Sequence, residues 1–150
     1  MAVDSLKGVY VLMIELSQGA VVQVGALGIV HFAKGLYAYV GSAQDGLEKR
    51  IERHIRKEKR VFWHVDYLLE NPDTRIRAVF VKEAPKTTEC TIAVVIGQNG
   101  EAVAGFGCSD CRCLSHLHRI EGYDFLFGFM RELDMPNPST ISLTAPVSVC

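Results

Sequence analysis

The sequence contains no apolar run that approaches the eighteen or so residues needed to span a bilayer. Its first residues also lack the basic and apolar segments of a secretory signal peptide. We therefore expect a cytoplasmic protein with no membrane partner. The formal net charge is only -1, so any preference for an anionic partner must come from a local cluster of charge.

An even set of cysteines is absent too, because the chain has five. Without a signal peptide, this odd number excludes a secreted disulfide framework as the expected architecture. Thiols that form no disulfide, or a metal site, are expected instead. The sequence also shows no repeat and no linker, and its 150 residues suit one domain with a single core, 1–150, ending in an irregular tail from about residue 135.

Hydrophobic patterning predicts both strands and helices. The expected strands are 8–16, its hairpin partner 21–24, a short run at 29–32, 36–40 and 75–82. The expected helices are 47 to about 60, 62–69, 89–96 and 123–133. Without regular βαβ alternation, this mixture predicts an α+β fold with a small, mainly antiparallel central sheet flanked by helices.

Two of these helices have recognisable start signals. Asp45 and Glu48 have the spacing of a capping box before the helix at 47, although Asp replaces the usual Ser or Thr. Thr88 is a natural N-cap for the helix that follows it. This cap would place Glu89 in the first turn, where a carboxylate also interacts favourably with the helix dipole.

The first helix carries an unusual concentration of positive charge. Residues 49–60 contain seven Lys or Arg and two Glu, whereas the rest of the chain is acidic. Such a segment is either a binding surface for an anion or a solvated helix with Glu–Lys pairs. Arg50 and His54 are four residues apart and share one face at the edge of the apolar stripe, just after the strand that ends at Tyr39. A phenol, a guanidinium and an imidazole at one strand-to-helix junction could act together on a phosphate.

Three short motifs in this order carry a family resemblance. Gly8-Val9-Tyr10, then Tyr39-Val40-Gly41, then Arg50 with His54 resemble the GIY-YIG endonuclease superfamily. More narrowly, VGSA, RHIRKEKRVFWHVDYLL, Glu89-Cys90 and FGCSDCRCLSHL are similar to an archaeal uncharacterised subfamily, domain of unknown function 123, which also occurs fused to endonuclease III-like repair enzymes. The resemblance implies a GIY-YIG nuclease-like fold.

The resemblance also implies an activity, which is hydrolysis of phosphodiester bonds in nucleic acid with one Mg²⁺ or Mn²⁺. DNA is expected more than RNA, with a role in DNA repair and a repair protein as partner. Tyr39 would be the general base and Tyr10 its neighbour, Arg50 would stabilise the phosphate charge, and His54 would bind phosphate or shuttle a proton. Glu89 would be the metal ligand.

Further residues are expected to bind substrate: Ser42, Arg53, Lys57 and His64. Two departures from the superfamily pattern accompany them. Tyr10 and Tyr39 are widely separated, so residues 17–35 must form an inserted hairpin or loop. The late Asn of many members has no clear counterpart, and Asn99 lies in a Gly-rich turn.

A cysteine-rich segment offers a different chemistry. Cys108, Cys111, Cys113, His116 and His118 are soft ligands close together in sequence, as a structural Zn²⁺ site requires. Their spacing is not that of a zinc ribbon, and buried thiols or a disulfide to Cys90 are alternatives. Ser109, Asp110 and His116 could instead line the nuclease site.

The sequence therefore predicts a metal-dependent endonuclease and leaves two alternatives open. These are a non-catalytic nucleic-acid-binding module of the same fold and a zinc-stabilised interaction domain. The sequence leaves the oligomeric state open.

Overall fold

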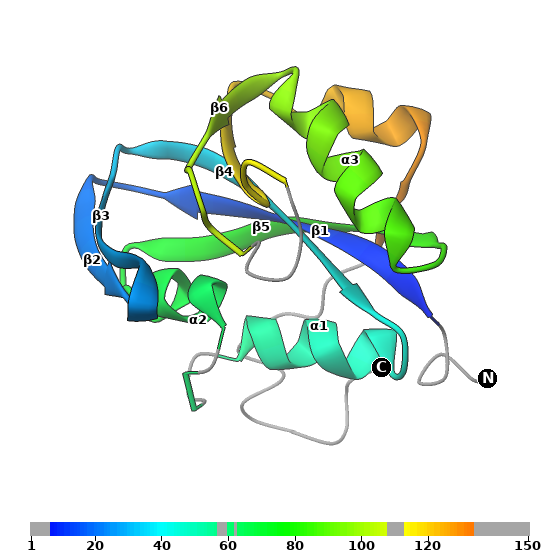
Figure 1. The fold of residues 1–150 in the computed structure, drawn as a ribbon, viewed down its shortest axis with the longest axis horizontal. Coiled ribbons are helices and arrows are strands. Elements are labelled where there is room, and N and C mark those ends of the chain that lie inside the picture. The colour runs from blue at the N-terminus through cyan, green and yellow to red at the C-terminus, as the bar shows by residue number, and fades with distance from the viewer. Residues whose placement is uncertain (1–6, 57–59, 62, 108–112, 134–150) are drawn as a thin grey trace.

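A central antiparallel sheet organises the computed structural model, which describes residues 7–56, 60–61, 63–107 and 113–133 (Figure 1). The sheet has six strands in the order β6-β7-β4-β1-β5-β8. Their bounds are β1 Gly8–Leu16, β4 Gly35–Ala43, β5 Thr74–Glu83, β6 Gly100–Ala102, β7 Leu117–Ile120 and β8 Arg131–Leu133. A separate two-stranded sheet joins β2 Ala20–Val24 to β3 Gly28–Phe32.

Strand β1 lies at the centre of the sheet and is buried on both faces. Its odd and even residues belong to two different apolar clusters, with Tyr10 and Leu12 on one face and Val9 and Val11 on the other. A strand covered on both sides needs apolar residues at successive positions. This explains why the sequence here reads as an almost continuous hydrophobic run.

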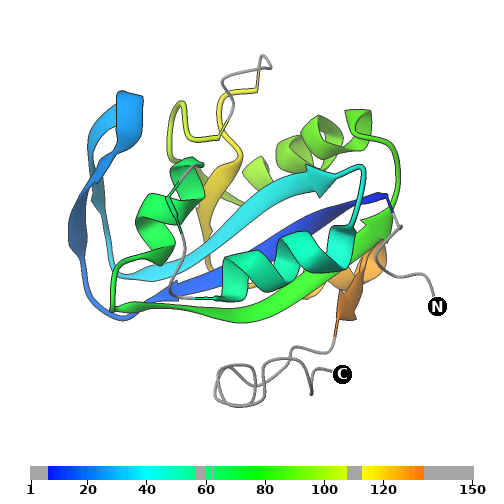
Figure 2. The ribbon, with the colours of Figure 1, turned by 90° about the horizontal axis from the view of Figure 1, so that it is seen from below.

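Helices cover the two faces of the sheet and make three layers (Figure 2). The face that carries Tyr10 is covered by α1 Leu47–Ile55 and α2 His64–Leu69. The opposite face is covered by α3 Thr87–Gly97 and the 3-10 helix η3 Asp124–Gly128. A second short 3-10 helix, η2 Gly25–Leu27, connects β2 to β3. The α+β class and the mainly antiparallel sheet are confirmed. Among the described residues, no helix has both the length and the apolar character to cross a membrane.

The segment between β1 and β4 forms an inserted hairpin, one of the two forms, hairpin or loop, that were expected for residues 17–35. The prediction that 21–24 pairs with the first strand is wrong, because β2 pairs with β3 and β1 pairs with β4 and β5. Burial alternates along β2, and Val21 is 63% exposed. That pattern suits a sheet with one covered face, not the doubly covered centre where β1 lies.

Several predicted helix limits are also wrong. The capping box at Asp45 does not form, because the N-cap of α1 is Gly46 in the left-handed conformation (φ 73°) with no side-chain cap. Helix α1 ends at Ile55, since Arg56 is extended. Helix α3 starts at Thr87 with Lys86 as its N-cap, so Thr88 lies within the first turn. Glu89 is nevertheless in that turn.

The helix predicted for 123–133 is replaced by η3 followed by strand β8. Here the edge of the sheet decides the local structure, because β8 pairs with Val79, Phe80 and Val81 of β5. The apolar side chains that recur at helical spacing pack partly from the 3-10 turn and partly from the strand. The tail from about residue 135 lies outside the described residues.

Candidate active site

A cavity of about 430 Å³ opens where strand β4 loses a neighbour. Strand β7 pairs with β4 only over Leu36–Tyr39, and the last bond on this side runs from the Val40 N–H to the His116 carbonyl (2.9 Å). The next β4 residues, Gly41 and Ser42, line the cavity, which we call the cleft. Helix α1 reaches it from one face of the sheet and α3 from the other.

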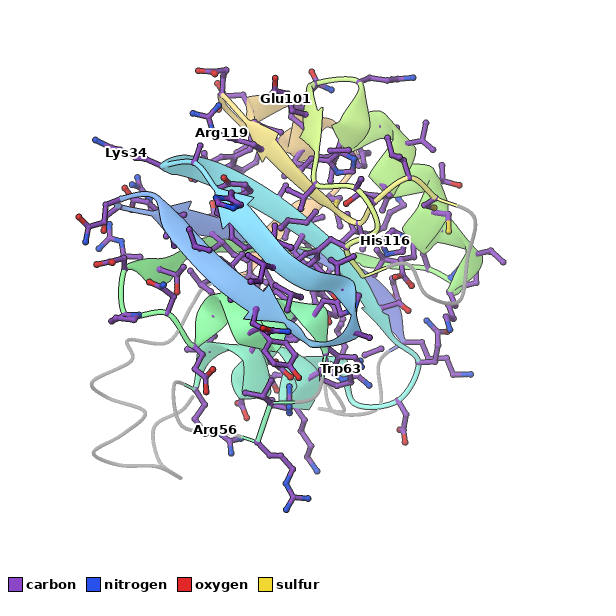
Figure 3. All side chains as sticks on the ribbon, turned by 60° about the vertical axis from the view of Figure 1, so that its left-hand side comes forward. Lys34, Arg56, Trp63, Glu101, His116 and Arg119 are labelled. Carbon is purple, nitrogen blue, oxygen red and sulfur yellow. The ribbon has the colours of Figure 1, made fainter. Side chains whose placement is uncertain are left out.

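The cleft brings together most of the residues predicted for the site. Its lining includes Tyr10, Tyr39, Ser42, Arg50, His64 and Glu89. Three further lining residues were not predicted: Trp63, Lys86 and Gly107. Figure 3 labels Trp63 beside α1 and α2 and His116 beside α3, which are the two flanks of the cleft.

The Tyr10 phenol crosses Gly41 to reach His54. Tyr10 and Gly41 are opposite each other in the register of β1 and β4. A Cβ at position 41 would lie 2.5 Å from the Tyr10 hydroxyl oxygen, so only glycine leaves room for this ring. The hydroxyl forms a 2.7 Å hydrogen bond with Nε2 of His54, which is buried behind the cleft. Tyr10 is thus tied to a group that can exchange protons with it.

Burial dominates the ionisation of both tyrosines. It raises the pKa of Tyr10 well above its ordinary value, and the nearby Arg50 guanidinium lowers it by less. Burial likewise raises the pKa of Tyr39, and the negative charges of Glu89 and Asp66 add to the effect. Both phenols are therefore protonated at neutral pH in this structure.

Asp66 supports the site from inside the protein and was not predicted. Its fully buried carboxylate accepts two hydrogen bonds from Arg53, each 3.0 Å. It also accepts one from the Trp63 N–H at the start of α2 (2.9 Å), and its Oδ1 lies 4.0 Å from Nδ1 of His54. Arg53 is thus paired with a buried carboxylate, and it is not among the residues that line the cleft. Its role in substrate binding stays a prediction.

Arg50 is held between a carbonyl and an aromatic ring. Its Nη1 donates to the Ser42 carbonyl oxygen (3.1 Å), on the edge of β4 that β7 leaves open. Its guanidinium carbon lies 4.6 Å from the centre of the Trp63 ring, and that of Arg53 lies 4.5 Å from the same ring. A guanidinium has five N–H donors, so this arrangement leaves donors for a phosphate in the cleft.

Glu89 faces the cleft with both carboxylate oxygens engaged. Oε1 accepts a hydrogen bond from the Ser42 hydroxyl (2.9 Å), and Oε2 lies 2.9 Å from Nδ1 of His116. It is the only carboxylate among the described residues that line the cleft. Each oxygen has a second lone pair, so Glu89 could still bind a metal ion.

His64 has a defined tautomer. Its Nδ1 accepts a hydrogen bond from the Gly107 N–H (2.8 Å), so in the neutral ring the hydrogen is on Nε2. Burial lowers the pKa of His64 and favours that neutral form. The ring can thus donate one hydrogen bond within the cleft.

The structure places the remaining predicted residues less directly. His54 contacts Tyr10 but does not line the cleft, and Lys57 lies outside the described residues. Of the three residues proposed to line the site from the cysteine-rich segment, His116 reaches Glu89, whereas Ser109 and Asp110 lie outside the described part of the chain. Trp63 is the one tryptophan of the sequence and lies three residues after the basic segment 49–60, which was the available signal for it.

A second group of residues near Glu89 could hold a metal ion. The sulfur atoms of Cys90 and Cys113 and a ring nitrogen of His116 lie within 4.8 Å of one another. Cys108 and Cys111 of the predicted cysteine cluster lie outside the described residues, and His118, on β7, does not belong to this group.

Comparison with known families gives one result of broad coverage. A family model with the description "Domain of unknown function DUF123" matches residues 9–133. No curated protein and no solved structure matches the chain. The matched range includes every described residue that lines the cleft.

Proposed function

The chain belongs to the family described as Domain of unknown function DUF123, and from this premise we propose that it is a metal-dependent endonuclease that hydrolyses phosphodiester bonds in nucleic acid. One observation carries the proposal. Side chains from four separate elements, Tyr10, Tyr39, Arg50 and Glu89, meet in one open cleft although they are spread over eighty residues of sequence. Phenol, guanidinium and carboxylate groups together suit a reaction at a phosphate.

The ordered motifs around these residues support the same activity. Gly8-Val9-Tyr10 and Tyr39-Val40-Gly41, which carry the superfamily resemblance, lie on neighbouring antiparallel strands with Tyr10 opposite Gly41, and this pairing supports the proposal. Two tyrosine-bearing strands followed by a helix with Arg50 and His54 are what that resemblance implies. The GIY-YIG nuclease fold is therefore part of the proposal.

Arg50 would bind the scissile phosphate. Its position is set on two sides, by the Ser42 carbonyl and by the Trp63 ring. Such a preorganised guanidinium stabilises the charge that develops on the phosphoryl oxygens without reorganising during the reaction. Lys86, which also lines the cleft, adds a second positive charge near the same place.

The raised pKa of both tyrosines bears on how the attacking water loses its proton. A lasting phenolate is unfavourable on Tyr39 and on Tyr10. Tyr10, however, is hydrogen-bonded to Nε2 of His54. As the water passes its proton to the Tyr10 oxygen, the phenolic proton can move to the imidazole, so the phenol carries no lasting charge. In this proposal Tyr10 and His54 act as the base in place of Tyr39, the base that the family resemblance implies, and Tyr39 orients the water or the phosphate.

The donor set of the cleft fits a hard divalent cation. Mg²⁺ and Mn²⁺ commonly use one or two carboxylates, with waters and substrate phosphates completing the shell. Glu89 provides the carboxylate, and the open cavity has room for waters beside it. The ion would supply positive charge to the phosphate and to its leaving oxygen. The protein's part is to hold Glu89 through Ser42 and His116.

Nucleic acid is the proposed substrate because two basic side chains, Arg50 and Lys86, line the cleft. The helix that carries Arg50 is itself rich in positive charge: Lys49 and Arg53 belong to it and Arg56 follows it directly. DNA is proposed before RNA, and a place in DNA repair with a repair-protein partner rests on the family resemblance alone.

Cleavage assays with matched variants test the proposal. The purified protein is incubated with Mg²⁺ or Mn²⁺ and with single-stranded, double-stranded or branched DNA and RNA. Glu89→Gln keeps the shape of the side chain but removes its charge, so we expect cleavage to fall at least a hundredfold while binding is retained. Glu101→Gln is the control, because Glu101 is exposed on the distant edge strand β6 (Figure 3). This variant should cut at the wild-type rate.

The raised pKa of the two phenols also favours one alternative, a nucleic-acid-binding module that does not cleave. The same assays decide between them. Wild-type protein that binds but never cuts with either ion would support the module. Equal cutting by Glu89→Gln and wild type would exclude the role proposed for Glu89.

A further inference from the structure

We propose that Cys90, Cys113 and His116 bind a zinc ion directly behind Glu89, at a site separate from the divalent-metal position in the cleft. The three residues come from different parts of the fold. Cys90 is in the first turn of α3, whereas Cys113 and His116 precede strand β7. Tertiary folding alone brings these ligands together, and it does so beside the proposed catalytic carboxylate.

The distances suit a small cation. The three ligand atoms lie within 4.8 Å of one another, and Cys90 Sγ is 3.9 Å from Nε2 of His116. With zinc bond lengths of about 2.3 Å to sulfur and about 2.0 Å to nitrogen, ligand atoms of a tetrahedral site are roughly 3.5–3.8 Å apart. Small side-chain rotations therefore close the group around an ion.

The chemistry of the ligands selects the ion. Two thiolates and an imidazole are soft donors that favour zinc, whereas Mg²⁺ and Mn²⁺ prefer oxygen. Cys90 and Cys113 are thiols in this structure, not halves of a disulfide. Three protein ligands leave a fourth position for water or for another group of the chain. The hard ion proposed for the cleft and the soft ion proposed here would thus not compete for the same donors.

Glu89 connects this group to the cleft. Nδ1 of His116 lies 2.9 Å from Glu89 Oε2, and the other ring nitrogen is the one beside Cys90. A metal on Nε2 fixes the hydrogen on Nδ1, which then donates to the carboxylate. Carboxylate–histidine–zinc chains of this kind are a recurring arrangement that orients the ligand. Here the same series of contacts, from zinc through His116 to the carboxylate, would also hold Glu89 in place at the cleft.

The proposal differs from the zinc site expected from sequence. That expectation grouped cysteines and histidines between residues 108 and 118, whereas here Cys90 of α3 provides one of the three ligands. The Glu89-Cys90 pair thus has two roles at adjacent positions. Glu89 faces the cleft, and Cys90 faces the segment before β7.

Metal analysis of the full chain tests the site without nucleic acid. Protein purified in reducing buffer and incubated with Zn²⁺ is desalted, and its zinc content is measured by mass spectrometry. We expect about one equivalent for wild type and for the control His31→Gln, a change of an exposed residue on β3, and at least tenfold less for Cys90→Ser and for Cys113→Ser. Wild type that retains less than a tenth of an equivalent, or cysteine variants that retain the full amount, would overturn the proposal.

A second measurement uses wild-type protein only, so it does not require the cysteine variants to fold. In wild-type protein, zinc should slow alkylation of Cys90 and Cys113 at least tenfold, as read by peptide mass spectrometry, and Co²⁺ should give the absorption of a thiolate complex. Unchanged alkylation with added zinc would contradict the site. These readouts contain no nuclease step, so zinc binding without cleavage would count against the proposed function and leave this site standing.

Discussion

At the scale of single residues, the closest constraint in the cleft is between Gly41 and Tyr10. The hydroxyl oxygen and Cζ of Tyr10 would lie 2.5 and 2.6 Å from a Cβ at position 41. The ring cannot easily move away, because it is buried and hydrogen-bonded to His54. The glycine of the Tyr39-Val40-Gly41 motif is thus explained by the aromatic ring of the neighbouring strand, not by a turn.

Gly41→Ala should therefore displace Tyr10 and weaken its bond to His54. We expect the free energy of unfolding to fall by about 1–3 kcal/mol, as for other overpacked cores, and cleavage to fall with it. Urea denaturation followed by circular dichroism measures the change. Gly122→Ala is the matched control, because within the described part of the chain no atom beyond its sequence neighbours lies within 4 Å of its added Cβ. This change should alter stability by less than about 0.5 kcal/mol. Equal effects of both substitutions would contradict the packing argument.

The two buried phenols predict a loss of stability at high pH. The pKa of Tyr10 and of Tyr39 is raised in the folded chain. Their contribution to the free energy of unfolding is therefore complete below the ordinary tyrosine pKa of about 10, and it is lost as the pH rises through their pKa in the folded chain. Above pH 10 the unfolded chain releases protons that the folded chain keeps. The free energy of unfolding should then fall by up to about 1.4 kcal/mol per pH unit for each tyrosine.

Urea unfolding at several pH values above 10 measures this slope, and Tyr10→Phe should make it shallower. Spectrophotometric titration of phenolate gives an independent reading on the folded protein. If all five tyrosines ionised near pH 10 before unfolding, the assigned burial of Tyr10 and Tyr39 would be wrong.

At the scale of elements, Asp66 joins α1 to α2. It accepts the Trp63 N–H at the start of α2 and pairs with Arg53 of α1 through both of its oxygens. Trp63 in turn packs beside Arg50 and Arg53. The position of α1 relative to the cleft therefore depends on a buried carboxylate that is not among the described residues lining the cleft.

Asp66→Asn should uncouple the two helices. An amide cannot accept both guanidinium hydrogen bonds, and Arg53 would lose a charge partner that is fully buried. We expect the free energy of unfolding to fall by about 2–3 kcal/mol. This is at or just below the lower end of the range for breaking a buried pair, because the Arg53 side chain is 24% exposed. Thermal and urea unfolding measure the loss. Glu70→Gln, an exposed change directly after the same helix, should leave stability almost unchanged.

At the scale of the whole molecule, positive charge is concentrated in one segment, residues 49–60, of an otherwise acidic chain. The exposed Arg56 follows α1 and is labelled in Figure 3, where it lies away from the sheet. Arg131 is exposed on β8, at the edge of the sheet opposite to β6. Arg56 thus directly follows the helix that carries the cleft residue Arg50, whereas β8 contributes no residue to the described lining of the cleft.

Binding of DNA should therefore weaken steeply with salt, and the two arginines should differ. Arg56→Gln should make the negative slope of log K against log salt shallower by about 0.9, the value for one phosphate contact on duplex DNA. Arg131→Gln should not alter the slope. Fluorescence anisotropy between about 50 and 200 mM salt measures both slopes. Identical slopes for the two variants would place the nucleic acid elsewhere.

Local patterns were sufficient for much of this molecule. A continuous apolar run predicted β1, and polar–apolar alternation predicted β5. Helical spacing predicted α1, and start and stop signals predicted α3. These features depend on neighbours in sequence, where strand and helix periodicity act. The residues proposed for the site could also be identified in the sequence, because they lie in short motifs at the ends of strands and helices.

Other features depend on contacts between distant segments, which no local pattern contains. Strand β8 forms where a helix was predicted because the edge of β5 offers it backbone partners. Asp66 gains its role from the burial that α1 imposes on it, and Cys90 meets Cys113 and His116 only because α3 packs beside the segment before β7. Sequence periodicity sets which elements form, whereas burial and edge pairing, which exist only in the folded chain, set where the chemistry of the cleft is assembled.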